Sequence, residues 1–230
     1  MLDAMRSDQA YTGESQKLVF RPAVASDAAT CASLIFASGA REFGFFLGMP
    51  AAECIEFLRF AFVQTFGRFS WRRHWVAVAD DGTVCAVLAL LDGRTLLFDD
   101  LHIAWLLVRY LGVTSRTLQA LSRGVTLEGE LPKPRRHQTL IAHCATNEHL
   151  RATGIFSALF RNVLRPKLLD VVDGRQLILD VLVSNTRAQA LYRRLGFADT
   201  SRSRDRSPRL PSELASIRMV LDLRRGDGER

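Results

Sequence analysis

The stretch from Leu177 to Phe197 constrains the fold more than any other part of the chain. It begins as an apolar, strand-like run, Leu177 to Val183, and continues into a short segment with helical periodicity. Asn185 is typical of a helix N-cap, and Gly196 is typical of the residue that ends a helix. The segment therefore predicts a strand followed directly by a short helix that presents one tyrosine, Tyr192.

A second signal lies upstream, where the strand-like run Thr139 to Thr146 precedes an Arg-x-x-Gly turn, Arg151 to Gly154, and an amphipathic helix. Such a turn presents several backbone N–H groups and the positive end of a helix dipole, which suits a pyrophosphate. Arg-x-x-Gly alone is a weak motif. It becomes specific together with Asn-x-x-Ala-x-x-Leu-Tyr-x-x-x-Gly-Phe, which begins at Asn185 and ends at Phe197.

With both motifs present, the chain resembles the GNAT superfamily, the acyl-CoA-dependent N-acyltransferases. The resemblance is sharp over Thr139 to Phe197 and looser over Lys17 to Leu91, where the order strand, helix, helix, strand, strand also fits. It implies an α/β fold with a mixed central sheet of about six or seven strands flanked by helices. It also implies that an acetyl or other acyl group passes directly from acetyl-CoA, the co-substrate, to a primary amine.

The same resemblance implies a binding site for CoA, with the pyrophosphate on the Arg151 turn and the pantetheine arm along the strand before it. The residues implied to bind the co-substrate are Cys144, Ala145, Thr146, Arg151, Ala152, Thr153, Gly154, Ile155, Phe156 and Asn185. Asn185 would contact the pantetheine arm, and Tyr192 would be the acid that protonates the departing thiolate. Phe156 departs from the pattern, which has Gly or Ala there. Its ring either blocks the approach of the phosphates or points into the helix interface and leaves its amide available.

Direct acyl transfer needs a neutral amine, a hydrogen-bond donor for the carbonyl oxygen and a proton for the thiolate. A tyrosine hydroxyl suits the last role, which favours Tyr192. His143, on the predicted strand, is the candidate base, because neutral histidine accepts protons near pH 7. The alternatives are a purely structural His143, water alone as the base, Glu148 before the turn, and His74, which carries less weight. The resemblance also implies that Glu42, in the glycine-broken segment 41–48, lines the acceptor cleft; plain packing of that segment is the alternative.

The sequence lacks the motifs of several other enzyme classes. Ser26, Ser157 and Ser184 do not stand in Gly-x-Ser-x-Gly, and there is no Walker loop, dinucleotide fingerprint or metal-binding helix motif. The four cysteines are scattered without a Cys-x-x-Cys, so we expect reduced, buried thiols and no metal. The alternative to an acyltransferase is a protein of the same fold that binds CoA or a protein partner without turnover.

Composition sets the outer bounds. The chain has 230 residues, 48% of them hydrophobic, which is enough for one full core. We expect a disordered segment over residues 1–16, a single domain over 17–223 and a frayed tail over 224–230. No apolar run approaches 18 residues, and the first residues do not form a signal sequence, so a soluble, cytoplasmic protein without membrane contact is expected.

The net charge is +7, and much of it lies in arginine-rich patches. These patches are Arg68, Arg72 and Arg73; Lys133, Arg135 and Arg136; and Arg202, Arg204, Arg206 and Arg209. Polyanions could bind there, but a solvated face is the favoured interpretation, and no aromatic platform accompanies the Ser/Arg segment 201–211. Nucleic acid is therefore not the expected partner; the expected partner is a small-molecule or peptide amine.

The pattern predicts strands, helices and one large insertion. The expected elements are a strand over 17–21, a helix from the Ser26-Asp27 cap to about Ala40, a break over the glycines 39, 44 and 48, a helix over 50–66, a hairpin of strands 74–79 and 84–91, a strand over 139–146, a helix over 154–167, a strand over 176–183, a helix over 185–195, and strands over 197–201 and 216–223. Between the third and fourth strands, residues 95–134 have helical periodicity. Helices that complete the core are favoured there, and a wall of the acceptor site or a homodimer surface are the alternatives.

Overall fold

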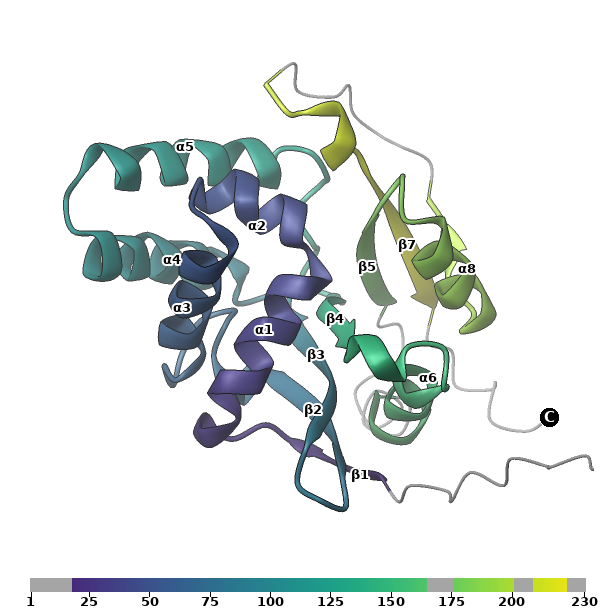
Figure 1. Cartoon of the computed structure of the whole chain (residues 1–230). Coiled ribbons are helices and arrows are strands. Elements are labelled where there is room, and N and C mark those ends of the chain that lie inside the picture. Colours follow the sequence, from purple (N-terminus) through teal and green to yellow (C-terminus); the bar gives the residue numbers. More distant parts are fainter. Residues whose placement is uncertain (1–17, 165–175, 201–208, 223–230) are drawn as a thin grey trace, which may run out of the picture.

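The computed structural model describes residues 18–164, 176–200 and 209–222 (Figure 1). Within these residues, seven strands form one mixed sheet in the order β1-β2-β3-β4-β5-β7-β6. The strands are β1 (Leu18–Pro22), β2 (His74–Ala79), β3 (Val84–Asp92), β4 (Gln138–Thr146), β5 (Gln176–Leu182), β6 (Ala198–Asp199) and β7 (Ser216–Asp222). All neighbours are antiparallel except β4 and β5, which are parallel. The expected mixed sheet flanked by helices is confirmed.

Helices cover both faces of the sheet, and the two largest parts of the core lie on opposite faces. The helices are α1 (Ala28–Ser38), α2 (Ala40–Leu47), α3 (Ala51–Phe62), α4 (Leu96–Leu111), α5 (Ser115–Glu128), α6 (Ile155–Leu159) and α8 (Thr186–Arg194). One part of the core, with Ile35, Phe57 and Phe62, lies under α1 to α5. The other part, with Leu159 and Tyr192, lies under α6 and α8. A residue of the sheet can therefore be assigned to a face by the part of the core that it joins.

Several boundaries differ from expectation, and one expected break is wrong. Residues 40–47 form the helix α2 although Gly44 lies within it. A single glycine costs about 1 kcal/mol in a helix interior, and the burial of Phe46 and Leu47 against the core offsets this cost. Helix α3 ends at Phe62, before the expected Phe66.

Other differences concern the ends of elements. Helix α6 is shorter than expected and continues as a π-helical turn, Phe160–Leu164, while β6 has only two residues. The predicted disordered segment 1–16, the tail 224–230 and the arginines 202, 204 and 206 lie outside the described residues. In the described ranges, no helix combines the length and apolar character needed to cross a membrane.

The insertion forms the helical pair α4 and α5, as expected. Leu106 and Leu107 of α4 and Ala120 of α5 are buried in the core under α1 to α5, which confirms that the insertion completes this core. Helix α5 lies over α2 (Figure 1). The approach is close, because a Cβ added at Gly124 would lie 3.0 Å from the Phe46 ring.

The parallel strands β4 and β5 separate halfway along. They pair from Gln138 to Ile141 on β4 and from Gln176 to Leu179 on β5. Beyond these residues β5 stays paired with β7 as far as Leu182, whereas β4 follows β3. The edge of the second half of β4 that faces β5 therefore has no strand partner on that side among the described residues.

Candidate active site

A β-bulge lies in β4 where the two parallel strands separate. Ala142 pairs with Ala89 and Ala145 pairs with Val87, so Leu88 alone stands opposite both His143 and Cys144. His143 has φ 54°, in the left-handed region that few residues other than glycine adopt. The extra residue reverses the alternation of faces. His143 therefore joins the face under α1 to α5, and Cys144 joins the face under α6 and α8.

His143 contacts aromatic rings from α2, from β2 and from the loop after α3. The Phe69 ring lies over it with centroids 5.2 Å apart and planes 15° apart, and Phe43 of α2 lies at 6.2 Å. Its Nδ1 lies 3.0 Å from Nε2 of His74 at the start of β2. His74 is itself buried, and its Nδ1 lies 2.7 Å from the carbonyl oxygen of Ser70. The structure thus brings together two histidines that are 69 residues apart in the sequence.

Both histidines are held neutral at pH 7. Burial lowers the pKa of His74 to about 4. Burial also lowers the pKa of His143 well below its usual value, and the nearby His74 and the Arg68 guanidinium lower it further. A neutral imidazole has a lone pair that can accept a proton. His143 therefore has the protonation state of a base over a wide pH range.

Arg68 belongs to a charged network that links the loop after α3 to the insertion. It donates to Asp100 of α4 at 2.5 Å and to Glu128 of α5 at 2.6 Å, and Lys133 donates to Asp100 at 2.9 Å. The Arg68 side chain is largely buried. The insertion thus holds in place a positive charge that acts on His143.

Across β4, Cys144 interacts with Tyr192 of α8. Tyr192 is only 8% exposed and packs against the rings of Phe156 and Phe197. Burial, and next the Cys144 side chain, raise the pKa of Tyr192 well above 10. Its hydroxyl therefore keeps its proton at neutral pH and is available to donate it.

The turn before α6 has an unusual backbone. Ala152 has φ 70° and Gly154 has φ 86°, so two left-handed residues flank Thr153. Such alternation turns successive N–H groups toward one side and makes a concave anion site. A Cβ added at Gly154 would meet nothing within 4 Å, so the chain is not crowded at this position of the turn.

Phe156, which departs from the resembling pattern, does not block this turn. Its ring is 8% exposed and contacts Tyr192 edge-on, with centroids 6.1 Å apart. Of the two alternatives for Phe156, the structure has the ring in the helix interface. Its amide belongs to the first turn of α6, where backbone N–H groups have no helical partner.

Two further predicted residues have local roles. Asn185 caps α8, because its Oδ1 accepts a hydrogen bond from the Ala188 amide at 3.1 Å. Arg151 is exposed and its Nη1 lies 3.4 Å from Glu148. Glu148 lies in a 3-10 turn, and its side chain is exposed. It is therefore not enclosed beside β4.

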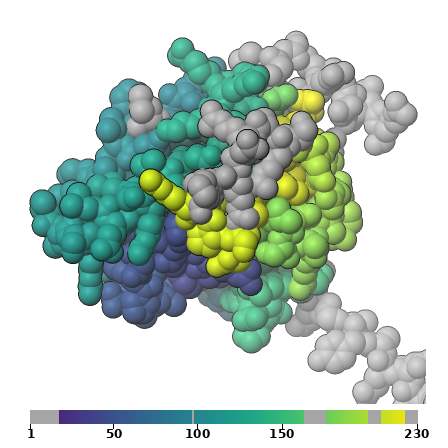
Figure 2. All heavy atoms as spheres, turned by 90° about the horizontal axis from the view of Figure 1, so that it is seen from above, coloured from purple at the N-terminus to yellow at the C-terminus, as the bar shows by residue number. Residues whose placement is uncertain are grey.

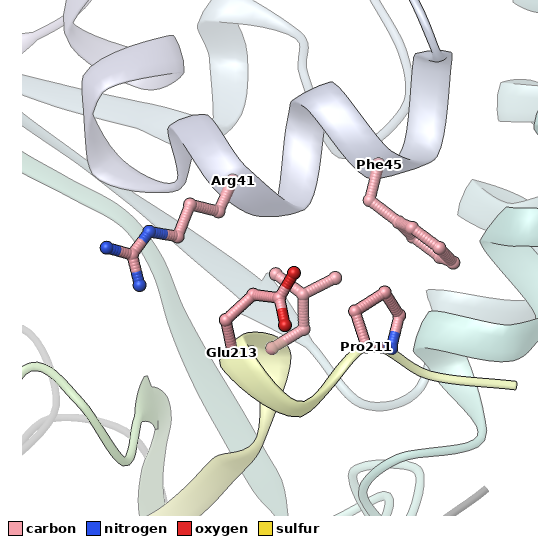
Figure 3. A pocket seen from close by; sticks show the side chains of 5 residues that line it. Arg41, Phe45, Pro211 and Glu213 are labelled. Carbon is pink, nitrogen blue, oxygen red and sulfur yellow. The ribbon is translucent and has the colours of Figure 1, made fainter. Parts of the chain in front are cut away.

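A pocket of about 350 Å³ lies between α2 and the C-terminal 3-10 turn, Ser212–Leu214 (Figure 3). Arg41 and Phe45 project from α2, and Glu213 rises toward them from the turn; Pro211 and Leu214 complete the lining. In the view from above, the yellow atoms of the C-terminal segment lie between the teal insertion and the green residues that include α8 (Figure 2). The pocket is thus made by segments far apart in the sequence.

Glu42, proposed from the sequence as a residue of the acceptor side, lies on α2 beside this pocket. Its carboxylate is folded back toward Gly39, where an added Cβ would lie 3.3 Å from Oε2. Burial raises the pKa of Glu42, and within the described part of the chain its Oε2 has no hydrogen-bond partner. Glu42 is not among the charged groups of the described residues that act on His143.

Sequence reasoning missed or underrated some residues at the site. Glu213 had no recognisable signal, because it meets α2 only in the folded chain, whereas Arg41 and Phe45 belong to the segment 41–48 that the sequence proposed for the acceptor cleft. His74 had a weak signal as a histidine at the start of a strand. In the described residues, no cluster of His, Cys, Asp and Glu suits a metal ion, and the four cysteines are free.

Comparison with known proteins places the fold. No protein-family model and no curated protein sequence matches the chain. Solved structures do match. An N-acetyltransferase from Staphylococcus aureus Mu50 is 18% identical over 89% of this chain and 100% of its own, with a TM-score of 0.64. A GNAT-family acetyltransferase from the same organism is 12% identical over 90% and 100%, with a TM-score of 0.52.

A third solved structure is the polyamine N-acetyltransferase of Drosophila melanogaster, an enzyme that forms N-acetylagmatine. It is 16% identical over 90% of this chain and 100% of its own, with a TM-score of 0.51. At these identities the likeness is one of fold. The chain has the fold of the GNAT acetyltransferases, as the motifs predicted.

Proposed function

We propose that this chain, which has the GNAT acetyltransferase fold, transfers an acetyl group from acetyl-CoA directly to a primary amine. The observation that carries the proposal is the β4 bulge. It puts a neutral histidine, His143, on one face of the strand and leaves a protonated tyrosine, Tyr192, on the other. Direct transfer needs a base on the acceptor side and an acid on the thiolate side of one thioester, and this arrangement supports His143 and Tyr192 in these two roles.

The residues present fit CoA. The amides of the turn from Arg151 to Phe156 suit the pyrophosphate, because two left-handed residues and a helix start concentrate N–H groups there. The free edge of β4 from Cys144 to Thr146 suits the amide groups of the pantetheine arm. Asn185, at the start of α8, flanks the same space from β5.

Tyr192 would act as the acid. In transfer, the bond between the acetyl carbon and sulfur breaks and its electron pair stays on sulfur. The Tyr192 hydroxyl donates its proton to that sulfur and is reprotonated from solvent. A raised pKa keeps the proton on oxygen until negative charge develops beside it.

His143 would act as the base. Its imidazole lies on the face under α1 to α5, so an acceptor amine approaches the thioester from that side. Nε2 takes a proton from the attacking nitrogen, whose electron pair forms the new bond to carbon. The pocket of Arg41, Phe45 and Glu213 is the candidate entry for the amine, since it opens beside α2, which also carries Phe43 against His143.

The test is turnover of acetyl-CoA across a panel of primary amines: polyamines, amino acids, peptides and aminoglycosides. Release of free thiol that depends on one amine supports the proposal. A thermal shift with CoA is measured in parallel on protein free of copurified CoA. A ligand at 100 times its Kd stabilises the folded state by about 2.7 kcal/mol. No shift at millimolar CoA contradicts the CoA site, and a shift without any turnover favours the alternative of binding without catalysis.

A further inference from the structure

We infer that His74 is a positioning residue, which holds His143 in the tautomer whose Nε2 is free to accept a proton. This inference rests on the proposed acetyl transfer, in which His143 is the base. His74 lies at the start of β2 on the same face of the sheet as His143, and it acts through its contact with His143.

The tautomer follows from hydrogen-bond accounting. The Ser70 carbonyl oxygen can only accept, so Nδ1 of His74, 2.7 Å away, must carry a proton. A neutral His74 then has a lone pair on Nε2. Nδ1 of His143, 3.0 Å from that lone pair, must therefore be the donor. Because neutral imidazole has one N–H, Nε2 of His143 carries the lone pair.

The contact between the two rings has the geometry of an in-plane hydrogen bond of ordinary length. Their planes are 9° apart and their centroids are 5.2 Å apart. Stacked rings keep their atoms about 3.5 Å apart, which is longer than the 3.0 Å between the two nitrogens. The rings therefore meet edge to edge, with the lone pair of His74 in the plane of the His143 N–H.

The carbonyl that starts this chain is held firmly. Ser70 is buried, its Oγ donates to the Gln64 carbonyl at 2.6 Å, and its amide donates to the Gly67 carbonyl at 3.2 Å. The Arg73 amide donates to the Ser70 carbonyl at 2.9 Å. A carbonyl fixed in this way cannot rotate to let His74 change its tautomer at low cost.

The same arrangement suits the protonated state of the base. When Nε2 of His143 accepts a proton from the amine nitrogen, the N–H bond breaks and its electron pair stays on nitrogen. The imidazolium keeps its Nδ1 hydrogen bond to His74, now charge-assisted and stronger. His74 stays neutral, because its burial opposes a positive charge on the ring. Nε2 then returns its proton to solvent.

The test begins with the protein alone. In ¹⁵N-histidine-labelled protein at pH 7, two-bond ¹H–¹⁵N correlations should assign the proton of His143 to Nδ1. In His74→Phe, which keeps the ring but removes both nitrogens, this preference should be lost. Turnover should fall by about tenfold or more, within the range of acid–base contributions. His74→Gln, which can present an oxygen acceptor to Nδ1, should recover both the tautomer and part of the activity.

Phe62→Leu is the matched control, because Phe62 contacts the His74 ring with centroids 5.1 Å apart but makes none of these hydrogen bonds. It should lower the melting temperature without changing the tautomer. A wild-type His143 protonated on Nε2, or unchanged turnover in His74→Phe, overturns the inference. If His143 of the wild type has the expected tautomer but the protein acetylates no amine, the positioning of His143 by His74 is supported. The proposed acetyl transfer is then overturned.

Discussion

Tyr192 and Cys144 interact on the α8 side of β4, across the strand from His143. Burial raises the pKa of the Cys144 thiol to about 12, so this thiol is protonated at neutral pH. Since only the thiolate is a strong nucleophile, Cys144 does not suit a covalent acyl intermediate. The pair therefore favours direct transfer with Tyr192 as the acid, and it offers two neighbouring side chains that can be tested separately.

Tyr192→Phe should lower kcat by about tenfold to a thousandfold, because it removes the proton donor but keeps the ring. The KM for acetyl-CoA should change little, since the hydroxyl matters only when charge develops on sulfur. Steady-state kinetics and melting temperature on one preparation measure both effects. Cys144→Ala removes the side chain that interacts with Tyr192 and should keep most of the activity. Equal losses in the two variants would contradict the assignment of the acid.

Gly154→Ala should weaken CoA binding. Residues other than glycine pay roughly 1–2 kcal/mol in the left-handed region, and Gly154 has φ 86°. The strain should rotate the amides of the turn, so Kd for CoA, measured by calorimetry, should rise. Gly82→Ala is the matched control, because Gly82 has φ 83° in the β2–β3 hairpin and equally open surroundings. Both variants should lose similar stability. If the Gly154→Ala variant binds CoA with the same Kd as the wild type, this turn is excluded as the pyrophosphate site.

Arg68→Gln should move the acidic limb of the kcat/KM profile to higher pH. Arg68 lowers the pKa of His143, and its removal leaves the carboxylates of Asp100 and Glu128 uncompensated, which raises that pKa further. Within the described ranges, the other titratable group that acts on His143 is His74, which stays neutral. Rates at closely spaced pH values measure the shift.

Lys133→Gln is the control for this profile. Lys133 also pairs with Asp100, but its side chain is mostly exposed and it does not act on His143. Its profile should match the wild type. An Arg68→Gln profile that is unchanged, in a protein that stays folded, would argue that His143 is not the group that titrates.

Acid should destabilise the protein through His74. Its pKa is about 4 when folded and about 6.5 when unfolded, so between these values the unfolded chain binds the extra proton. Lowering the pH therefore lowers the free energy of unfolding. The contribution of neutral His74 is fully present above pH 6.5, and about 3 kcal/mol of it is lost by pH 4. Urea unfolding at several pH values should therefore give a shallower pH dependence for His74→Phe than for the wild type. Parallel pH dependences would contradict a neutral, buried His74.

Much of the fold was predictable because its signals are local. The Asp80-Asp81-Gly82 turn, the Arg151 turn and the Asn185 to Gly196 helix each depend on residues a few positions apart, and the structure has each element near its expected bounds. The predicted break at Gly44 was wrong because the helix there depends on contacts that are not local. The stability of α2 comes from packing against the core and against α5, which no local pattern contains.

Local sequence patterns are sufficient to predict the strand–turn–helix order, the tyrosine on α8 and the glycine that the turn before α6 requires. The face of β4 that His143 occupies depends on tertiary contacts. The reason is physical: regular alternation would put His143 on the face of Ile141, and the bulge that reverses it depends on how many β4 residues oppose Leu88 of β3. The His74 contact likewise exists only because strand pairing brings residues 69 positions apart within hydrogen-bond distance.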